Sequence, residues 1–277
     1  MRSSGTGMRR WAMCLWAGCW ALVAVVGLAG CATTGGAGRA DSHADIVTES
    51  DEPEVRKRAR IRLQLAVGYF EQGQTAIALD EIKQALAVDP SYADAFNLRG
   101  LIYMRLNDLR LAEDSFRRAM ALNPRDANVT HNYGWLLCQQ ARYAESYQAF
   151  GQALANPTYG GRAKTWMTQG LCQLRAGLQA EAEHSLSKSY ELDAGNPVTG
   201  YNLASLLYQR GELGRAQFYI RRLNNSELAN AESLWLGIKI EQRQGNRDAV
   251  EQLATQLKRR YPQSREAGAY ERGAFNE

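Results

Sequence analysis

The chain has 277 residues, of which 45% are hydrophobic, and a formal net charge of +4. Three of its 33 basic residues (Arg2, Arg9 and Arg10) lie before residue 31, where no acid occurs, so the remainder sets 30 basic residues against 29 acidic ones. This balance gives no support to nucleic-acid binding, and we expect none. Only six prolines and no alternating strand patterns predict an all-α protein with a sizeable core.

The N-terminus has the pattern of a secretory signal. Arg9 and Arg10 precede an uncharged stretch, Trp11 to Gly30, as in a basic region followed by an apolar one. Met8 is an alternative start to Met1 that gives a more compact basic region. We therefore predict a signal peptide over residues 1–30.

The apolar stretch ends in Leu-Ala-Gly-Cys, residues 28–31, which resembles a bacterial lipobox. The resemblance implies that Cys31 becomes the lipidated first residue of the mature chain, and several acyl chains anchor stably. An ordinary cleaved signal and an uncleaved membrane anchor are the alternatives, because the stretch is long enough to span a bilayer. Ala32 at the second position, in place of Asp, resembles the signal for transfer to the outer membrane.

Residues 31–55 read as a lipidated flexible tether, rich in Gly, Ala, Thr and Ser and then acidic. The glycine cluster at 35–38 lacks the strand before it and the Gly-Lys-Ser/Thr after it that a phosphate loop needs. A basic run over residues 56–62 opens the first predicted helix. We interpret it as a solvated helix face, with contact to anionic lipid as the alternative.

Two helices are predicted between Ala95 and Pro124. Small residues (Gly100, Ala112, Ala119) and large ones (Phe96, Tyr103, Phe116) each recur at helical spacing on one face. The small residues let the two backbones approach, and the large ones fill the gaps beside them. Pro124 ends the second helix.

This helix pair is repeated along the chain. Pro90 and Pro124 are 34 residues apart. Six copies of this period cover about residues 59–262, if the loop over 157–161 is taken to contain two residues more than the other loops. The pattern resembles the tetratricopeptide repeat and implies an all-α superhelical solenoid of six such repeats over 56–265, with a C-terminal tail over 266–277. The turns inside the pairs carry residues that tolerate positive φ: Gly73, Asn107, Gly177, Gly211 and Gly245.

Three copies depart from the pattern. The third lacks the turn glycine and has Ser146 in place of Ala, and the fourth has Gln173 in place of an aromatic residue. The last copy aligns on Gly237 and Leu253, with its turn one residue short.

Cys138 and Cys172 remain once the leader is removed and Cys31 is acylated. Both lie on the first helices of adjacent repeats, in a chain expected in the oxidising periplasm. Two alternatives are open: a disulfide, if the Cα atoms come within about 7 Å, or two buried free thiols.

No catalytic constellation is evident. The histidines are His43 in the tether and His131 and His184 on helices, and no metalloprotease, nucleophile-elbow or Cys-x-x-Cys motif occurs. We expect no enzymatic activity, cofactor or metal.

The first helices of a repeat solenoid line its concave surface, so a partner-binding groove is expected there. Leu63 and Val67 stand where carboxylate-binding relatives carry polar residues, which argues against a carboxylate clamp. A groove of Trp, Tyr and Met suits an apolar or amphipathic protein segment, although several of these side chains could belong to the core. The candidates are Asn97, Leu101, Met104, His131, Trp135, Cys138, Met167, Leu171, Leu174, Tyr201 and Tyr208.

Three segments, 132–140, 169–172 and 231–237, resemble the PilF/PilW family of type IV pilus biogenesis lipoproteins, as does the order of lipobox, tether, six repeats and tail. The resemblance covers nearly the whole mature chain and favours the Cys138–Cys172 disulfide. At the turn of Gln140 and Ala141 the family tends to carry Gly, and this departure should cost local stability.

The resemblance implies an outer-membrane pilotin, lipid-anchored on the periplasmic face, that helps the pilus secretin reach, assemble in or remain stable in the outer membrane. We expect a monomer whose protein partner is the secretin. The alternative is a periplasmic tetratricopeptide adaptor for another outer-membrane or cell-wall assembly complex, because this scaffold is widely shared.

Overall fold

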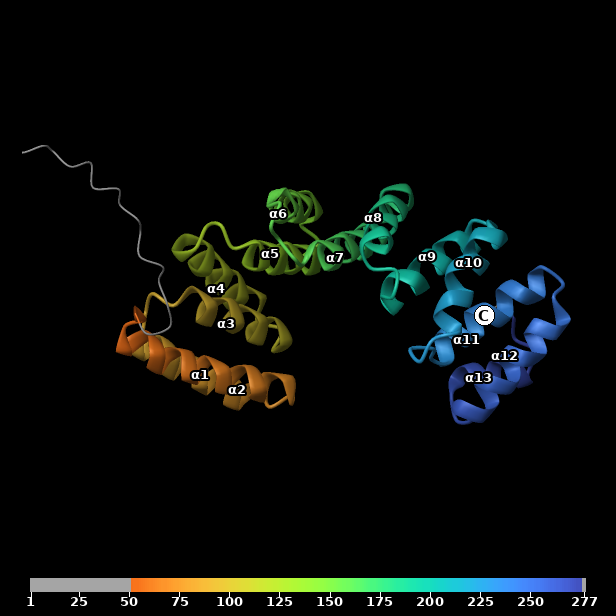
Figure 1. Ribbon diagram of the computed structural model, residues 1–277, viewed down its shortest axis with the longest axis horizontal. Helices are drawn as coiled ribbons and strands as arrows, with labels where there is room; N and C mark the ends of the chain where they lie inside the picture. Colours follow the sequence, from red (N-terminus) through yellow and green to blue (C-terminus); the bar gives the residue numbers. More distant parts are fainter. Residues whose placement is uncertain (1–50, 276–277) are drawn as a thin grey trace, which may run out of the picture. The chain divides into compact units, whose positions relative to one another are not determined.

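The computed structural model describes residues 51–275, so the predicted signal peptide, Cys31 and the tether up to residue 50 lie outside the described residues. The described part consists of helices joined by short turns (Figure 1). The helices are α1 (Glu54–Glu71), α2 (Thr75–Val88), α3 (Ala93–Arg105), α4 (Leu109–Leu122), α5 (Ala127–Gln139), α6 (Tyr143–Ala155), α7 (Arg162–Arg175), α8 (Gln179–Leu192), α9 (Pro197–Gln209), α10 (Leu213–Asn224), α11 (Ala231–Arg243), α12 (Arg247–Arg260) and α13 (Arg265–Glu271).

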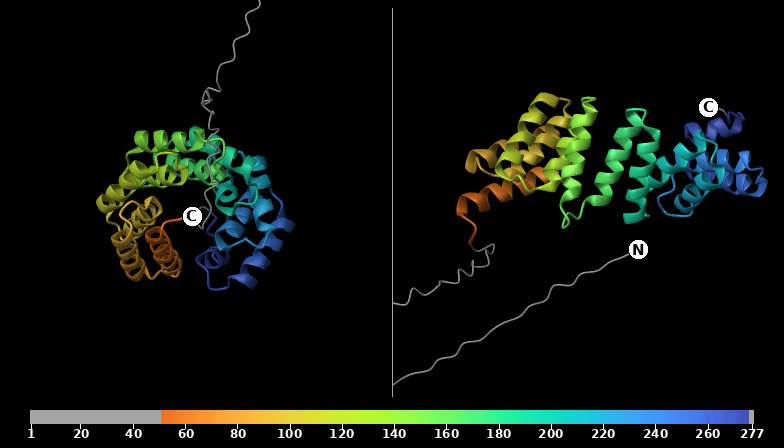
Figure 2. Two further views of the ribbon diagram at one scale, coloured as in Figure 1. Left: turned by 60° about the vertical axis from the view of Figure 1, so that its left-hand side comes forward. Right: turned by 90° about the horizontal axis from the view of Figure 1, so that it is seen from above.

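The helices pack in pairs. Each odd-numbered helix from α1 to α11 packs against the helix that follows it, and each second helix packs against the first helix of the next pair. The first helices of successive pairs also contact one another. Figure 2 shows the pairs succeeding one another in chain order. The prediction of an all-α solenoid of six tetratricopeptide repeats is confirmed.

Each pair is held together by residues of complementary size, 16 positions apart. A Cβ added to Gly100 would lie 2.5 Å from the Phe116 ring, and one added to Gly170 would lie 2.7 Å from Leu186. In the first pair the residue at the position of Gly100 is the larger Ala66, and the one at the position of Phe116 is the smaller Ile82. Both are fully buried. The volume of the two facing side chains is thus kept, as close packing requires.

The turn within each pair contains one residue whose backbone adopts the left-handed conformation. Gly73, Gly177, Gly211 and Gly245 have φ between 76° and 78°, and Asn107 has φ 60°. Ala141 adopts the same conformation, with φ 59°. The third turn therefore keeps its shape at a steric cost, because a Cβ is disfavoured in this region.

The last pair is in register one residue later than the sequence alignment predicted. Arg243 ends α11 two residues before the left-handed Gly245, as in the other pairs, so the turn is not short. Gly237 does lie against α12, since a Cβ on it would come 3.2 Å from Leu253. The residues at the positions of Gly100 and Phe116, counted from the turn, are Ile238 and Ala254, and both are buried in one cluster. The sizes are reversed in this pair: the large residue lies on the first helix and the small one on the second.

The predicted C-terminal tail is largely part of the folded domain. Its residues 266–271 belong to α13, which packs against α11 and α12 and buries Ala267 and Ala269 in the cluster that also contains Trp235. Trp235 lies against two aromatic rings from this segment, with centroid distances of 6.5 Å to Tyr270 and 5.4 Å to Phe275. The segment covers the apolar end of the last repeat, as terminal caps do in solenoids. Among residues 51–275 there is no helix long and apolar enough to cross a membrane.

Candidate partner-binding surface

The residues predicted to line a groove lie on α3, α5, α7 and α9, the first helices of the second to fifth repeats, and each of these helices contacts the next. We call the partly exposed residues of this predicted set the first-helix surface. These side chains are half-buried, so each keeps some apolar area in contact with solvent. They are Asn97, Leu101, Met104, Trp135, Met167, Leu171, Leu174, Tyr201 and Tyr208.

Two of the predicted groove residues do not lie on a surface. His131 is 4% exposed and Cys138 is 2% exposed. His131 is covered by Thr165 of the first turn of α7, which also contacts Tyr159 of the preceding loop, and Cys138 is buried where it bonds to Cys172. His131 is therefore a core residue and not a binding residue.

His131 is held by a buried hydrogen-bonded network. Its Nδ1 lies 2.9 Å from the Oγ1 of Thr165, which is 3.2 Å from the hydroxyl of Tyr159. Burial lowers the pKa of His131 to about 4, with the charge of Lys164 acting in the same direction. The imidazole is thus neutral at physiological pH. Within the described residues no group of three or more His, Cys, Asp or Glu is placed to hold a metal ion.

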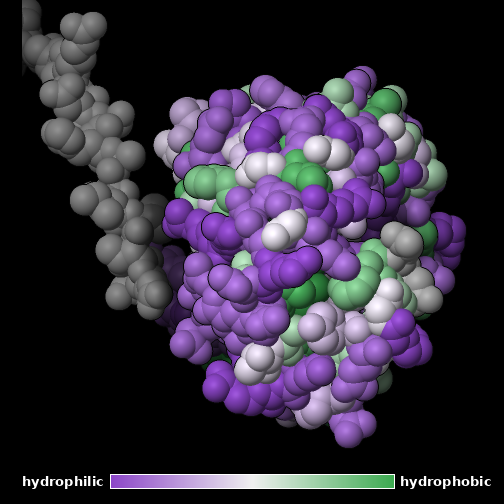
Figure 3. Space-filling model, turned by 90° about the vertical axis from the view of Figure 1, so that its right-hand side faces the viewer, coloured by the Kyte–Doolittle hydropathy of each residue, from purple (hydrophilic) through white to green (hydrophobic). Residues whose placement is uncertain are grey.

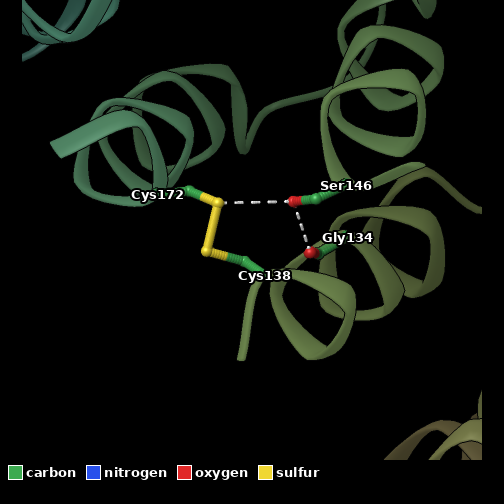
Figure 4. The surroundings of a disulfide bond; sticks show 4 residues. All are labelled: Gly134, Cys138, Ser146 and Cys172. Atoms are coloured by element: carbon green, nitrogen blue, oxygen red, sulfur yellow. Dashed lines mark hydrogen bonds between the residues drawn. A yellow bond between two sulfur atoms is a disulfide. The ribbon is translucent and has the colours of Figure 1, made fainter. Parts of the chain in front are cut away.

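Cys138 on α5 and Cys172 on α7 are joined by a disulfide in the structure, with Cα atoms 5.9 Å apart (Figure 4). Ser146, the departure from Ala in the third repeat, lies beside it. The Ser146 hydroxyl donates to the carbonyl oxygen of Gly134 at 2.8 Å and lies 3.6 Å from the Cys172 sulfur. The polar side chain is therefore accommodated by a local hydrogen bond, and the disulfide links two adjacent first helices covalently.

Adjacent first helices also meet through polar side chains and stacked cations. The Nδ2 of Asn132 donates to the Oδ1 of Asn97 at 3.0 Å. The guanidinium of Arg175 lies 4.8 Å from the centre of the Trp135 ring, and that of Arg243 lies 4.3 Å from Tyr208. Such stacks fix both partners while the cation remains accessible to solvent.

A third stack occurs near the N-terminal end. Arg105 lies 3.8 Å from the centre of the Phe70 ring and donates to the Phe70 carbonyl oxygen at 2.5 Å. The three arginines are exposed, and each comes two residues before a left-handed turn residue. Arg175 and Arg243 thus place positive charges next to two aromatic rings of the first-helix surface, and Arg105 places one beside α1.

These arginines were not among the residues predicted from the sequence to line the groove. The signal that could have found them is their shared position: alternate repeats, the second, fourth and sixth, carry Arg two residues before the turn residue. Their aromatic partners lie 35 or 40 residues earlier in the chain and come from the preceding first helix.

The basic run at the start of α1 is largely neutralised by ion pairs. Arg56 pairs with Asp89, Arg62 pairs with Glu81 at 2.9 Å, and Arg60 pairs with Glu52 at 3.0 Å. These contacts favour a solvated helix face over a lipid-binding patch, because the charges are already partnered within the domain.

Comparison with known proteins places this architecture in a family. A family model described as the tetratricopeptide repeat matches residues 63–127. The type IV pilus assembly protein PilF of Pseudomonas aeruginosa is 33% identical over 241 residues, which are 87% of this chain and 92% of that protein.

Solved structures agree with the sequence comparison. The structure of Pseudomonas aeruginosa PilF matches with a TM-score of 0.70 at 31% identity, covering 80% of this chain and 100% of that one. The structure of PilW, described as a widely conserved type IV pilus biogenesis factor, matches with a TM-score of 0.69 at 32% identity, covering 79% and 99%. The chain belongs to the PilF/PilW family of tetratricopeptide-repeat proteins.

Proposed function

We propose that this protein is a lipid-anchored pilotin of the type IV pilus secretin, acting in type IV pilus assembly from the periplasmic face of the outer membrane. The observation that carries the proposal is the match to PilF over 87% of the chain, because a match of this length covers far more than a few shared repeats. The solenoid is a binding scaffold in this account, and we assign it no enzymatic activity, cofactor or metal.

The first-helix surface is the proposed secretin-binding site. Its half-buried rings, among them Trp135, Tyr201 and Tyr208, offer apolar area for the face of an amphipathic segment. The stacked arginines Arg105 and Arg175 offer cations to acidic side chains on the same segment. Aromatic and Arg side chains are the residue types that dominate binding energy in protein interfaces.

The proposed anchor is Cys31, which lies outside the described residues. Its support is the Leu-Ala-Gly-Cys sequence at the end of the apolar leader and Ala32 after it. Stable attachment by several acyl chains would keep the repeats beside the outer membrane, where the secretin is assembled.

The test separates the anchor from the binding surface. A deletion strain is complemented with wild-type or Cys31→Ala protein, and surface pili and membrane fractions are measured. We expect wild type to restore pili and to fractionate with the outer membrane, and Cys31→Ala to leave the outer membrane and restore pili poorly. A deletion strain with normal pili would contradict the proposal and favour a periplasmic adaptor of another assembly complex.

A further inference from the structure

The first helix of the solenoid exposes an apolar face. α1 has 18 residues, whereas the other helices of the described chain have at most 14. Ile61 is 55% exposed and Leu65, one turn later, is 44% exposed. Gly68 follows on the same side of the helix, and a Cβ added to it would meet no atom within 4 Å. We call Ile61, Leu65 and Gly68 the α1 face.

The corresponding positions are buried in the other five repeats. Counted from the left-handed turn residue, the position of Ile61 is taken by fully buried residues: Ala95, Val129, Thr165, Thr199 and Ser233. The position of Gly68 is taken by residues at most 2% exposed: Ile102, Leu136, Cys172, Leu206 and Ile240. Ile102, for example, shares a core cluster with Ile82 and Ala85 of the preceding α2. The α1 face is therefore the side on which every later first helix receives another helix.

The opposite end of the solenoid is covered. α13 packs against α11 and α12 and buries Ala267 and Ala269. In Figure 3 the apolar areas on the face of the C-terminal repeats are small and are surrounded by polar residues. The apolar ends of a repeat solenoid need such a cover. Among residues 51–275 no helix gives the α1 face the cover that α13 gives the last repeat.

A second copy of α1, running antiparallel, has the shape that this face needs. When Ile61 lies opposite Gly68 of the second copy, two-fold symmetry places Gly68 opposite Ile61 as well. The midpoint between residues 61 and 68 lies next to residue 65, so the two Leu65 side chains meet beside the axis. The large side chain then fills the space beside a glycine, as Phe116 does at Gly100 within the second repeat.

The same register brings opposite charges together. Arg58 precedes Ile61 by three residues and Glu71 follows Gly68 by three, so Glu71 of one copy comes level with Arg58 of the other and with its neighbour Lys57. Within residues 51–275, Arg58 and Glu71 form no ion pair. A parallel pair would instead place Arg58 level with Arg58 and Ile61 level with Ile61, so charge and size both favour the antiparallel arrangement.

We propose that the α1 face joins two copies of this protein in an antiparallel, two-fold pair centred beside Leu65. One helix from each copy makes a small interface compared with the roughly 1,000 Å² of a stable complex. The pairing is therefore weak in dilute solution, where the monomer expected from the sequence prevails, and it strengthens when the proposed anchor concentrates copies in one membrane. It leaves the first-helix surface open and does not depend on secretin binding.

Cross-linking through single cysteines tests the register in the full-length, membrane-attached protein. Leu65→Cys should give a disulfide-linked dimer on mild oxidation, because the two residues meet beside the axis. Arg58→Cys is the matched control on the same helix and should give none, because antiparallel pairing separates its two copies by roughly 20 Å along the helices. Non-reducing gels measure both yields. No dimer from Leu65→Cys, as when a bilayer or another protein covers the face, or equal yields from both variants, would overturn the proposal.

Gly68→Leu separates this specific fit from general apolar association. The leucine fills the space that receives Ile61, so we expect it to lower the yield of the Leu65→Cys dimer about tenfold. Association through exposed apolar area alone would increase, because the variant adds a large apolar side chain. The variant has room to fold, since a Cβ there meets nothing within 4 Å, and thermal unfolding checks this. An unchanged or increased yield would overturn the proposal.

Charge exchange tests the ends of the interface. Glu71→Lys should lower the dimer yield severalfold, because three cations then come level with one another, and adding Lys57→Glu should restore most of it. Glu251→Lys makes the same change at an exposed position of α12 and should leave the yield as in the wild type. No recovery on adding Lys57→Glu, or an equal loss in Glu251→Lys, would contradict the antiparallel register.

Discussion

Gly100 and Phe116 lie so close that a single methyl group on Gly100 would come within 2.5 Å of the ring. The contact joins the two helices of the second repeat, and Phe116 is fully buried there. The third repeat uses the same combination, Gly134 and Phe150, and the other repeats meet the demand with different small and large residues, down to the reversed pair Ile238 and Ala254. The fold therefore depends on the summed size of two facing side chains.

Gly100→Ala is expected to destabilise the protein by about 1–3 kcal/mol, because the fully buried Phe116 ring must shift to admit the added methyl group. Gly68→Ala is the control, since a Cβ there meets nothing within 4 Å, and it should stabilise by about 0.5–1 kcal/mol. Denaturant unfolding measures both changes. Adding Phe116→Leu to Gly100→Ala should recover part of the loss, and no recovery would contradict the size argument.

Ala141→Gly is expected to raise the free energy of unfolding by about 1 kcal/mol, because Ala141 has a φ of 59° that a Cβ disfavours. Asn107→Gly, at the corresponding turn, should give a smaller gain, since asparagine tolerates this conformation better. Thermal unfolding of the two variants compares them directly. Loss of stability in Ala141→Gly would show that the alanine makes a contact of its own.

Removing the Cys138–Cys172 disulfide is expected to lower stability by about 3–4 kcal/mol, because the bond closes a loop across 34 positions in the unfolded chain. The measurement is unfolding of the wild type with and without reductant, beside a Cys138→Ala, Cys172→Ala double variant. The double variant should match the reduced protein. Two titratable thiols in protein purified under oxidising conditions would refute the bonded state.

Stability should fall on mild acidification because of His131. Its pKa is lowered from 6.5 to about 4, so below pH 6.5 the unfolded chain binds a proton that the folded chain does not. The stabilisation is complete above the unfolded pKa and is lost as pH falls towards the folded one, by about 2 kcal/mol between pH 7 and pH 5. His131→Gln should flatten this dependence in unfolding curves at the two pH values. An unchanged slope would assign the effect to other groups.

Charge reversal of the first-helix surface tests its proposed role. A variant with Arg105, Arg175 and Arg243 all replaced by Glu should bind the periplasmic part of the secretin on the order of tenfold more weakly at low salt. A matched variant reverses Arg110, Arg247 and Arg259, three exposed arginines on second helices, and should bind as wild type does. Equal affinity of the two variants would remove the arginines from the binding site.

The sequence predicted the repeats well because their signal is local and periodic. Small and large residues at helical spacing mark the pairs, and Gly or Asn107 marks every turn within a pair except the third, where Ala141 adopts the left-handed conformation. The last register was one residue early because Gly237 and Leu253 fit the usual small-then-large order and do lie against each other, whereas the turn at Gly245 puts Ile238 and Ala254 at the positions of Gly100 and Phe116. The seven residues of α13 are too few to show a period.

The candidate site was only partly predictable, since it depends on contacts between repeats. Trp135 and Tyr208 were identified from their helix positions, but the arginines stacked on them come from the next repeat. His131 was placed on the surface because it shares a helix face with Trp135. Its burial depends on Thr165 of α7 and on Tyr159 in the preceding loop, whose path no local pattern predicts.

The central claim is that the chain supports assembly of the type IV pilus secretin, and the most direct test is the level of secretin multimers in membranes of a deletion strain. We expect deletion to abolish the heat-resistant multimer while the secretin monomer is retained, and wild-type protein to restore the multimer. Cys31→Ala protein should restore multimers that remain in the wrong membrane. Unchanged multimers after deletion would contradict the pilotin function.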